Sequence, residues 1–172
     1  MGMFSWLIMI NYDMIRLNKK EETIHEQIRK EEIMSPYMEK AHKVREESDI
    51  HYNCAQGVLA AFAEELGIDE DTAFRVGANF GSGMRIGGTC GAVTGALMVL
   101  GLAGVDNGPE MQALIRRVRG NHEGVVDCKD LLRLNMETDV PKHEHCDNMV
   151  YEMVEMTEEI LREKGIIKED CE

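Results

Sequence analysis

The chain has 172 residues, a length typical of one domain, which buries enough surface to fold without disulfides. With 19 Lys and Arg against 32 Asp and Glu, the formal net charge is −13, which repels phosphate backbones and anionic lipid surfaces and excludes nucleic-acid binding as a function. Three prolines, 13 methionines and only 5% aromatic residues favour helices over a β-sandwich. We therefore expect an all-α protein.

The N-terminal segment, residues 1–45, is predicted to be a helical arm. Its apolar start has neither a basic segment before it nor a small-residue cleavage site, and is a poor signal peptide. The charged run that follows places Ile24, Ile28 and Ile33 on one helical stripe, which is typical of a solvated arm or of a helix that binds a partner or forms a homodimer. The odd, sparse set of five cysteines favours reduced thiols and a cytoplasmic protein.

Helices are predicted from Pro36 onward, the first of them running to about Glu47. From Asn53 a continuous apolar face predicts a second helix, which Gly67 caps, and Asp69 then opens a third. The residues of that apolar face are Ala55, Val58, Leu59, Phe62, Ala63 and Leu66.

A glycine-rich loop, residues 81–89, leads into a central helix from about Gly91 to Val105. The 20 residues between Arg85 and Asp106 carry no charge, but six of them are glycines, so we interpret this stretch as a buried core helix and not as a membrane span. Further helices are predicted over 108–124, 127–134 and 145–164, with a loop over 138–145.

These elements predict a compact bundle of about six helices around the central helix. The predicted domain spans residues 46–166 and is followed by a polar tail, residues 167–172. The last helix carries a stripe of core methionines, Met149, Met153 and Met156. The predicted core residues are Phe62, Leu66, Phe74, Leu97, Leu100, Met149 and Met153.

The cysteines lie at informative places. Four of them are expected in the first turn of a helix: Cys54, Cys90, Cys128 and Cys146. The residues expected to cap the first three of those helices are Asn53, Thr89 and Asp127. A helix N-terminus carries about half a positive charge and unpaired N–H groups, which shift a thiol toward the reactive thiolate. Cys171, in the polar tail, is predicted to be a bystander.

Glycines single out Cys90 as the leading nucleophile. Gly87 and Gly88 allow a tight turn into the central helix, and Gly91 is expected to leave one side of the thiol uncovered. Gly91 and Gly95 lie four residues apart on a helical face, which permits close approach of a neighbouring helix. We expect the pKa of Cys90 to be lower than the unperturbed value of about 8.5, so that Cys90 is alkylated first as pH rises.

The segment from Cys90 to Gly95, CGAVTG, resembles the C-G-A-x-x-G signature of the redox-active family named for its C_GCAxxG_C_C pattern. The resemblance covers about residues 46–165, and Cys54, Cys128 and Cys146 resemble that family's other three hallmark cysteines. Arg133 departs from the pattern, because it stands where glycine is expected. The resemblance implies a redox or metal–thiolate role for the four cysteines.

Three functional hypotheses follow. The leading one is a thiol redox protein, a possible thiol–disulfide oxidoreductase, in which Cys90 exchanges with one of the other three cysteines and the partner is a redox protein or a small thiol or disulfide. The second is a metal or iron–sulfur site, and its ligands would be Cys54, Cys90, Cys128 and Cys146. The third is a non-catalytic helical interaction module with incidental cysteines.

Geometry separates the first two hypotheses. A disulfide requires Cα atoms about 4.4–6.8 Å apart, whereas four metal ligands converge on one point. His143 and His145 lie close to Cys146 in sequence and could add imidazole ligands. Because the C-x₂-C spacing of zinc ribbons and ferredoxins is missing, we interpret these histidines as exposed loop residues.

Overall fold

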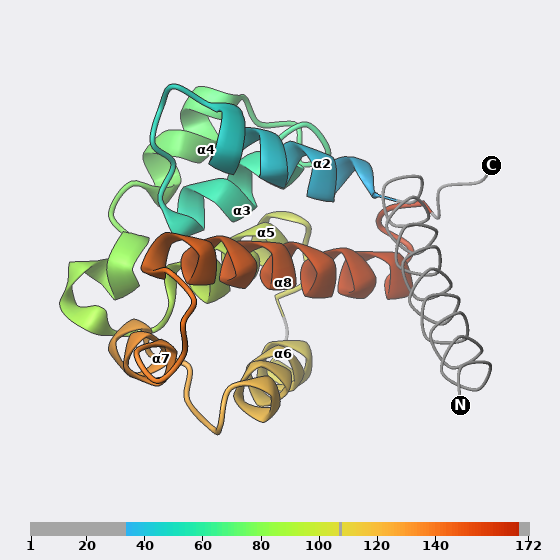
Figure 1. The fold of residues 1–172 in the computed structure, drawn as a ribbon. Coiled ribbons are helices and arrows are strands. Elements are labelled where there is room, and N and C mark those ends of the chain that lie inside the picture. The colour runs from blue at the N-terminus through green and yellow to red at the C-terminus, as the bar shows by residue number, and fades with distance from the viewer. Residues whose placement is uncertain (1–33, 107, 169–172) are drawn as a thin grey trace, which may run out of the picture. The chain divides into compact units, whose positions relative to one another are not determined.

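The computed structural model describes residues 34–106 and 108–168. From Pro36 onward these residues belong to one compact unit, and all of their regular elements are helices, which confirms the all-α prediction (Figure 1). The predicted stripe of the arm and the tail residue Cys171 lie outside the described residues. Within the two described ranges, no helix combines the length and apolar character needed to cross a membrane.

The helices follow the predicted order. The α-helices are α2 (Pro36–His42), α3 (Cys54–Phe62), α4 (Glu70–Gly77), α5 (Gly91–Leu102), α6 (Gly108–Asn121), α7 (Cys128–Asn135) and α8 (Lys142–Glu163). Two short π-helical segments are η1 (Lys43–Glu47), which continues α2, and η2 (Gly83–Gly87), which precedes α5.

Side-chain caps fix the starts of α3 and α4. The Asn53 Oδ1 accepts hydrogen bonds from the backbone N–H groups of Ala55 (3.0 Å) and Gln56 (3.1 Å), and the Gln56 Oε1 accepts one from the Asn53 N–H (2.8 Å). The Asp69 Oδ1 accepts a hydrogen bond from the Thr72 N–H at 2.7 Å. Each cap satisfies backbone donors that the first helical turn leaves unpaired, as the sequence predicts at both positions.

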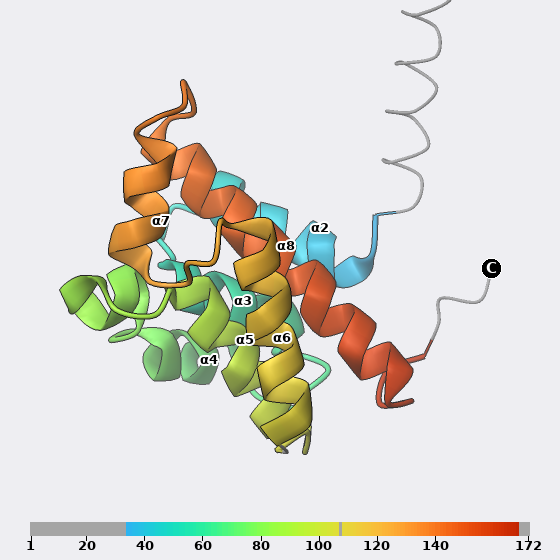
Figure 2. The ribbon, with the colours of Figure 1, turned by 90° about the horizontal axis from the view of Figure 1, so that it is seen from below.

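Helix α3 lies at the centre of the bundle, where it packs against α2, α4, α5 and α8. Helix α8 lies across α3 and α5, and α6 and α7 are on one side of it (Figures 1 and 2). Helix α5 is apolar on all sides and largely buried, as expected for a core helix. The predicted close approach at Gly95 is confirmed, since this glycine packs against the α3 backbone.

The core agrees with the sequence pattern at its centre and departs from it at the edges. Four of the predicted core residues are fully buried: Phe62, Leu100, Met149 and Met153. The other three pack against the core but remain half-exposed: Leu66, Phe74 and Leu97. Met156 is also buried, so the methionine stripe of α8 is core filler as predicted.

Three predicted helix boundaries are wrong. Helix α3 ends at Phe62 and not at the predicted cap Gly67, which closes the turn over residues 63–67 in the left-handed conformation (φ +65°). Helix α8 begins at Lys142, three residues before the predicted His145, because Pro141 occupies the N-cap position with extended backbone angles (φ −58°, ψ 145°). Helix α5 ends at Leu102 and not near Val105, because Gly104 adopts the left-handed conformation (φ +82°) that terminates helices.

Candidate functional site

The structure places three of the four cysteines at helix starts, as predicted. Cys54 is the first residue of α3, Cys128 is the first residue of α7, and Cys90 immediately precedes α5. Cys146 is the exception, because the earlier start of α8 puts it in the second turn of that helix. The prediction that Cys146 lies in the first turn is therefore wrong.

Two of the predicted caps also differ. Cys90 itself, and not Thr89, occupies the N-cap position of α5, with no side-chain hydrogen bond. Asp127 occupies the N-cap position of α7, but its carboxylate accepts no capping hydrogen bond. The sequence therefore predicts the starts of α5 and α7 correctly, but neither start has the predicted side-chain capping hydrogen bond.

Gly91 brings the starts of α3 and α5 together. A Cβ atom on Gly91 would lie 2.9 Å from the Phe80 carbonyl oxygen and 3.2 Å from the Cys54 Cβ. Only a residue without a side chain permits this approach, which places Cys54 beside the start of the helix that follows Cys90. The neighbour that Gly91 accommodates is therefore Cys54 and its helix.

A short antiparallel bridge between Thr89 and Asp127 joins the starts of α5 and α7. The Cys90 N–H donates to the Val126 carbonyl oxygen at 3.0 Å, and the Cys128 N–H donates to the Gly88 carbonyl oxygen at 2.7 Å. Two cysteines 38 positions apart in the sequence are therefore held on adjacent segments of backbone.

The loop that leads to this bridge turns in a left-handed conformation. Ser82, Gly83, Met84 and Arg85 have consecutive positive φ angles of 53°, 59°, 55° and 62°, a conformation that costs L-residues about 1–2 kcal/mol each. The turn closes with a hydrogen bond of 3.0 Å from the Gly88 N–H to the Gly83 carbonyl oxygen. The predicted glycine-rich loop is thus a closed turn with a defined backbone conformation.

Cys146 approaches the group from α8, where a hydrogen bond between its side chain and that of Cys54 affects the pKa of both cysteines. This hydrogen bond, with the positive charges of Arg45 and Lys142, lowers the pKa of Cys146 to about 7, against the opposing effects of partial burial and the Asp147 carboxylate. The same hydrogen bond, followed by burial, raises the pKa of Cys54. The pKa values of Cys54 and Cys146 are therefore shifted in opposite directions.

Cys90 behaves in the opposite way to the prediction. Its side chain is 5% exposed, so no side of the thiol is uncovered, and burial raises the pKa of Cys90 to about 11. The backbone N–H groups of Ala92 and Val93 lower that pKa, as a helix N-terminus should, but burial outweighs them. The prediction that Cys90 has the lowered pKa is wrong, and the thiol with that property is Cys146.

Cys128 completes the cluster as a half-buried thiol. Burial, followed by the charge of Cys146, raises the pKa of Cys128, and Lys142 acts in the opposite direction. The charge of Cys146 also raises the pKa of Cys90. Mutual electrostatic effects thus connect all four cysteines that the sequence singles out, and the structure brings them into one region of the bundle.

The structure places His143 and His145 in the first turn of α8, so the prediction that they are loop residues is wrong. His143 and His51 are exposed, and His145 is half-buried, where burial followed by the charge of His122 lowers its pKa. Across residues 34–106 and 108–168, no three His, Cys, Asp or Glu side chains converge as the ligands of a metal ion would.

Sequence reasoning missed Arg45 and Lys142, the two cations that act on the Cys146 thiolate. Lys142 was detectable, since it lies four residues before Cys146 and one helical turn separates them. Arg45 could not be detected from the sequence, because 101 positions separate it from Cys146.

A comparison with protein families matches residues 52–160 to the family described as "Putative redox-active protein (C_GCAxxG_C_C)". The matched segment contains all four clustered cysteines and more than half of the chain. No curated protein and no solved structure matches the chain.

Proposed function

The chain belongs to the C_GCAxxG_C_C family. From this premise we propose that it carries out thiol–disulfide exchange, with Cys146 as the nucleophile and Cys54 as its resolving partner. The observation that carries the proposal is the interaction of the Cys54 thiol with Cys146, which is the largest cause that lowers the pKa of Cys146 to about 7. A thiolate with a pKa near ambient pH combines a substantial reactive fraction with high nucleophilicity. Cys146 is also half-exposed, so that a partner disulfide can reach it.

In the first step, the Cys146 thiolate attacks one sulfur of a disulfide in a redox protein or a small molecule. A bond forms between Cys146 and that sulfur, the partner's S–S bond breaks, and the second partner sulfur leaves as a thiolate that takes a proton from solvent. Arg45 and Lys142 stabilise the attacking thiolate before the step, since both lower the pKa of Cys146.

In the second step, Cys54 resolves the mixed disulfide. While Cys146 is a thiolate, its hydrogen bond and charge raise the pKa of Cys54, so Cys54 keeps its proton. Once Cys146 is bonded to the partner, that charge is gone and Cys54 loses its proton more readily. Its thiolate attacks the Cys146 sulfur, and the remaining partner sulfur leaves as a thiol. Two protein thiols are oxidised to one disulfide, and one partner disulfide is reduced to two thiols.

Cys90 and Cys128 belong to the proposed site as neutral thiols. Burial is the main cause that raises the pKa of each, so neither competes with Cys146 for the incoming disulfide. Among the described residues, Cys90 and Cys128 are the two other thiols, and both are available to reduce a Cys54–Cys146 disulfide.

Alkylation of the reduced protein with iodoacetamide from pH 5 to 9, read by peptide mass, tests the proposal. Cys146 should react first, and its alkylation rate should reach half of its maximum near pH 7. Cys90 should react slowly even at pH 9. In Cys54→Ala the midpoint should move toward the ordinary thiol value of about 8.5, which leaves about 30-fold less thiolate at pH 6. Because a more basic thiolate is a better nucleophile, the rate at pH 6 should fall by about 6-fold.

Cys128→Ala is the matched control, because it removes a neighbouring thiol without removing the hydrogen bond to Cys146. The alkylation midpoint of Cys146 should stay in place in Cys128→Ala, since the groups that shift the pKa of Cys146 are Cys54, Arg45, Lys142 and Asp147, together with burial. A Cys146 midpoint at or above 8.5 in the unaltered protein, or a midpoint that Cys54→Ala leaves in place, would contradict the proposal. Treatment with a small disulfide should yield an intramolecular Cys54–Cys146 disulfide, detected as a linked peptide.

A further inference from the structure

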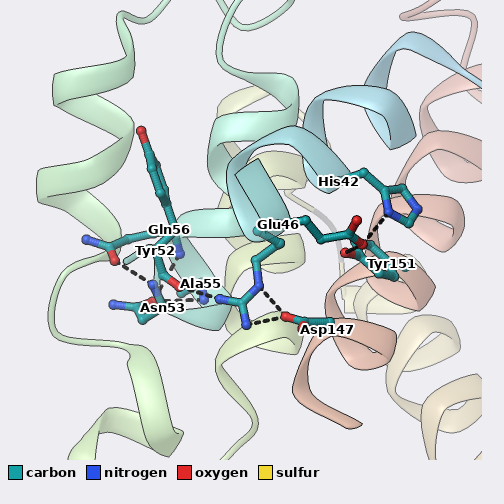
Figure 3. Close-up of polar contacts among 9 residues, drawn as sticks. His42, Glu46, Tyr52, Asn53, Ala55, Gln56, Asp147 and Tyr151 are labelled. Carbon is teal, nitrogen blue, oxygen red and sulfur yellow. Dashed lines mark hydrogen bonds and ion pairs between the residues drawn. The ribbon is translucent and has the colours of Figure 1, made fainter. Parts of the chain in front are cut away.

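Arg45 is a buried cation that contacts the chain beside both members of the Cys54–Cys146 pair. Its side chain is only 7% exposed. The Nε donates to the Asp147 Oδ1 at 2.6 Å and a terminal nitrogen also contacts that oxygen, while the other terminal nitrogen donates to the Tyr52 carbonyl oxygen. Asp147 directly follows Cys146, and Tyr52 stands two residues before Cys54. One guanidinium thus joins the start of α3 to α8 (Figure 3).

The packing of α3 accommodates this side chain. A Cβ on Gly57 would lie 3.0 Å from the Arg45 Cδ, so the aliphatic part of Arg45 passes over a residue without a side chain. Gly57 lies three residues after Cys54, close to one helical turn. Both ends of the arginine side chain are therefore fixed, the stem by α3 and the guanidinium by Asp147 and Tyr52.

A second contact holds η1 on α8 one turn further along. The Tyr151 hydroxyl donates to the Glu46 Oε1 at 2.7 Å, and the ring of Tyr151 stacks on His42 with centroids 3.9 Å apart (Figure 3). Because Asp147 and Tyr151 are four residues apart on one face of α8, the two contacts together fix the position of η1 along that helix.

We propose that Arg45, from a segment that precedes the family match, is a positioning residue that holds Cys146 against Cys54 by joining the chain beside each. The inference rests on the proposed function of that pair. Its physical basis is that a planar guanidinium fork donates in several fixed directions at once, which a lysine cannot reproduce. Its charge also favours the Cys146 thiolate, along with Lys142 and against Asp147.

The test follows the closure of the mixed disulfide, a step in which Cys146 carries no charge. The reduced protein is first converted to a mixed disulfide at Cys146 with a small aromatic disulfide. After the pH is raised, acid-quenched samples are analysed by mass for the Cys54–Cys146 disulfide. Arg45→Met retains a stem of similar length but loses the fork. Because small errors in position have large effects on such reactions, its closure should be at least about 10-fold slower.

Asp147→Asn is the second variant, and it separates position from charge. It weakens the ion pair with Arg45 and removes a carboxylate that raises the pKa of Cys146. Closure should slow as in Arg45→Met, while the alkylation midpoint of Cys146 should fall and not rise. A merely structural defect would not move these two readouts in this combination. Far-UV circular dichroism verifies that each variant retains its helices.

Arg117→Met is the matched control, because Arg117 forms an ion pair with Glu159 on α8, about three and a half turns from Cys146. Its closure rate should equal that of the unaltered protein. If both Arg45→Met and Asp147→Asn close as fast as this control, the inference is overturned while the proposed function stands. If the mixed disulfide of the unaltered protein never closes onto Cys54, the proposed function fails, and the inference fails with it.

Discussion

Replacing Gly95 by alanine tests the contact on which the whole cysteine cluster depends. Gly95 lies where α5 packs on α3, and a Cβ there would be 2.9 Å from the Ala55 carbonyl oxygen, 3.1 Å from the Ala55 Cα and 3.1 Å from the Val58 Cβ. Two of these three atoms are backbone, so no side chain can rotate away to make room. The two helices must separate to accept the methyl group.

The expected loss of stability in Gly95→Ala follows from a comparison with a second glycine of α5. Forcing a methyl group into a packed interface costs about 1–3 kcal/mol, whereas alanine is favoured over glycine in a helix by about 1 kcal/mol. At Gly101, also in α5, a Cβ would meet no atom of the described residues within 4 Å, so Gly101→Ala gains the helix preference without the clash. The difference between the two variants therefore isolates the packing cost, and Gly95→Ala should be less stable by about 1–3 kcal/mol.

Urea unfolding, followed by circular dichroism, measures this difference. With a slope near 2 kcal/mol per molar urea, a 2 kcal/mol difference places the midpoint of Gly95→Ala about 1 M below that of Gly101→Ala. Equal midpoints with equal slopes would refute the reasoning, because they would mean that α3 and α5 do not approach as closely as the structure shows. In Gly95→Ala we also expect faster alkylation of Cys90, since separation of the helices reduces the burial that raises its pKa.

Two further predictions concern single polar contacts. Asp69→Ala removes the acceptor for the Thr72 N–H and should destabilise the protein to urea by about 1 kcal/mol, whereas Asp69→Asn should cost much less. At Glu152, burial acts to raise the pKa, but hydrogen bonds from His122 (2.6 Å) and Asn121 (2.7 Å) bring it below its usual range. Its stabilising contribution is therefore complete above about pH 4.3 and lost as pH falls through the folded-state pKa. Glu152→Gln should lower the thermal midpoint at pH 7 and have no such effect at pH 2.5; an equal effect at both values would contradict this linkage.

The features that the sequence predicts correctly are those that depend on near neighbours in the chain. The apolar spacing of α3, the caps at Asn53 and Asp69, and the methionine stripe of α8 all involve residues within a few turns of each other. Such patterns determine which face of a helix is buried, because the helical period places those residues together. The start of α8 illustrates the limit, since the polar residues after Pro141 carry no apolar period that would identify the first turn.

The assembly of the site depends on contacts between distant parts of the chain, and here prediction from spacing fails. The sequence identified all four cysteines, but it left open which of them form a pair. Cys54 and Cys146 are 92 positions apart, and only the packing of α8 against α3 brings these two thiols near enough to affect each other's pKa. Arg45 joins the same two helices from a third element, so no local pattern could have connected it to the site.

The reversal between Cys90 and Cys146 shows why a helix N-terminus alone does not select the reactive thiol. Cys90 has the predicted backbone donors, and they do lower its pKa, but they act on a side chain almost completely removed from water. Loss of hydration opposes the thiolate more strongly than two backbone N–H groups favour it. Cys146 has no helix-start advantage, yet it remains half-exposed and receives a thiol hydrogen bond together with the charges of Arg45 and Lys142. Exposure is set by packing, so we expect the tertiary structure to select the attacking thiol. The change that should abolish the proposed exchange is therefore Cys146→Ser rather than Cys90→Ser.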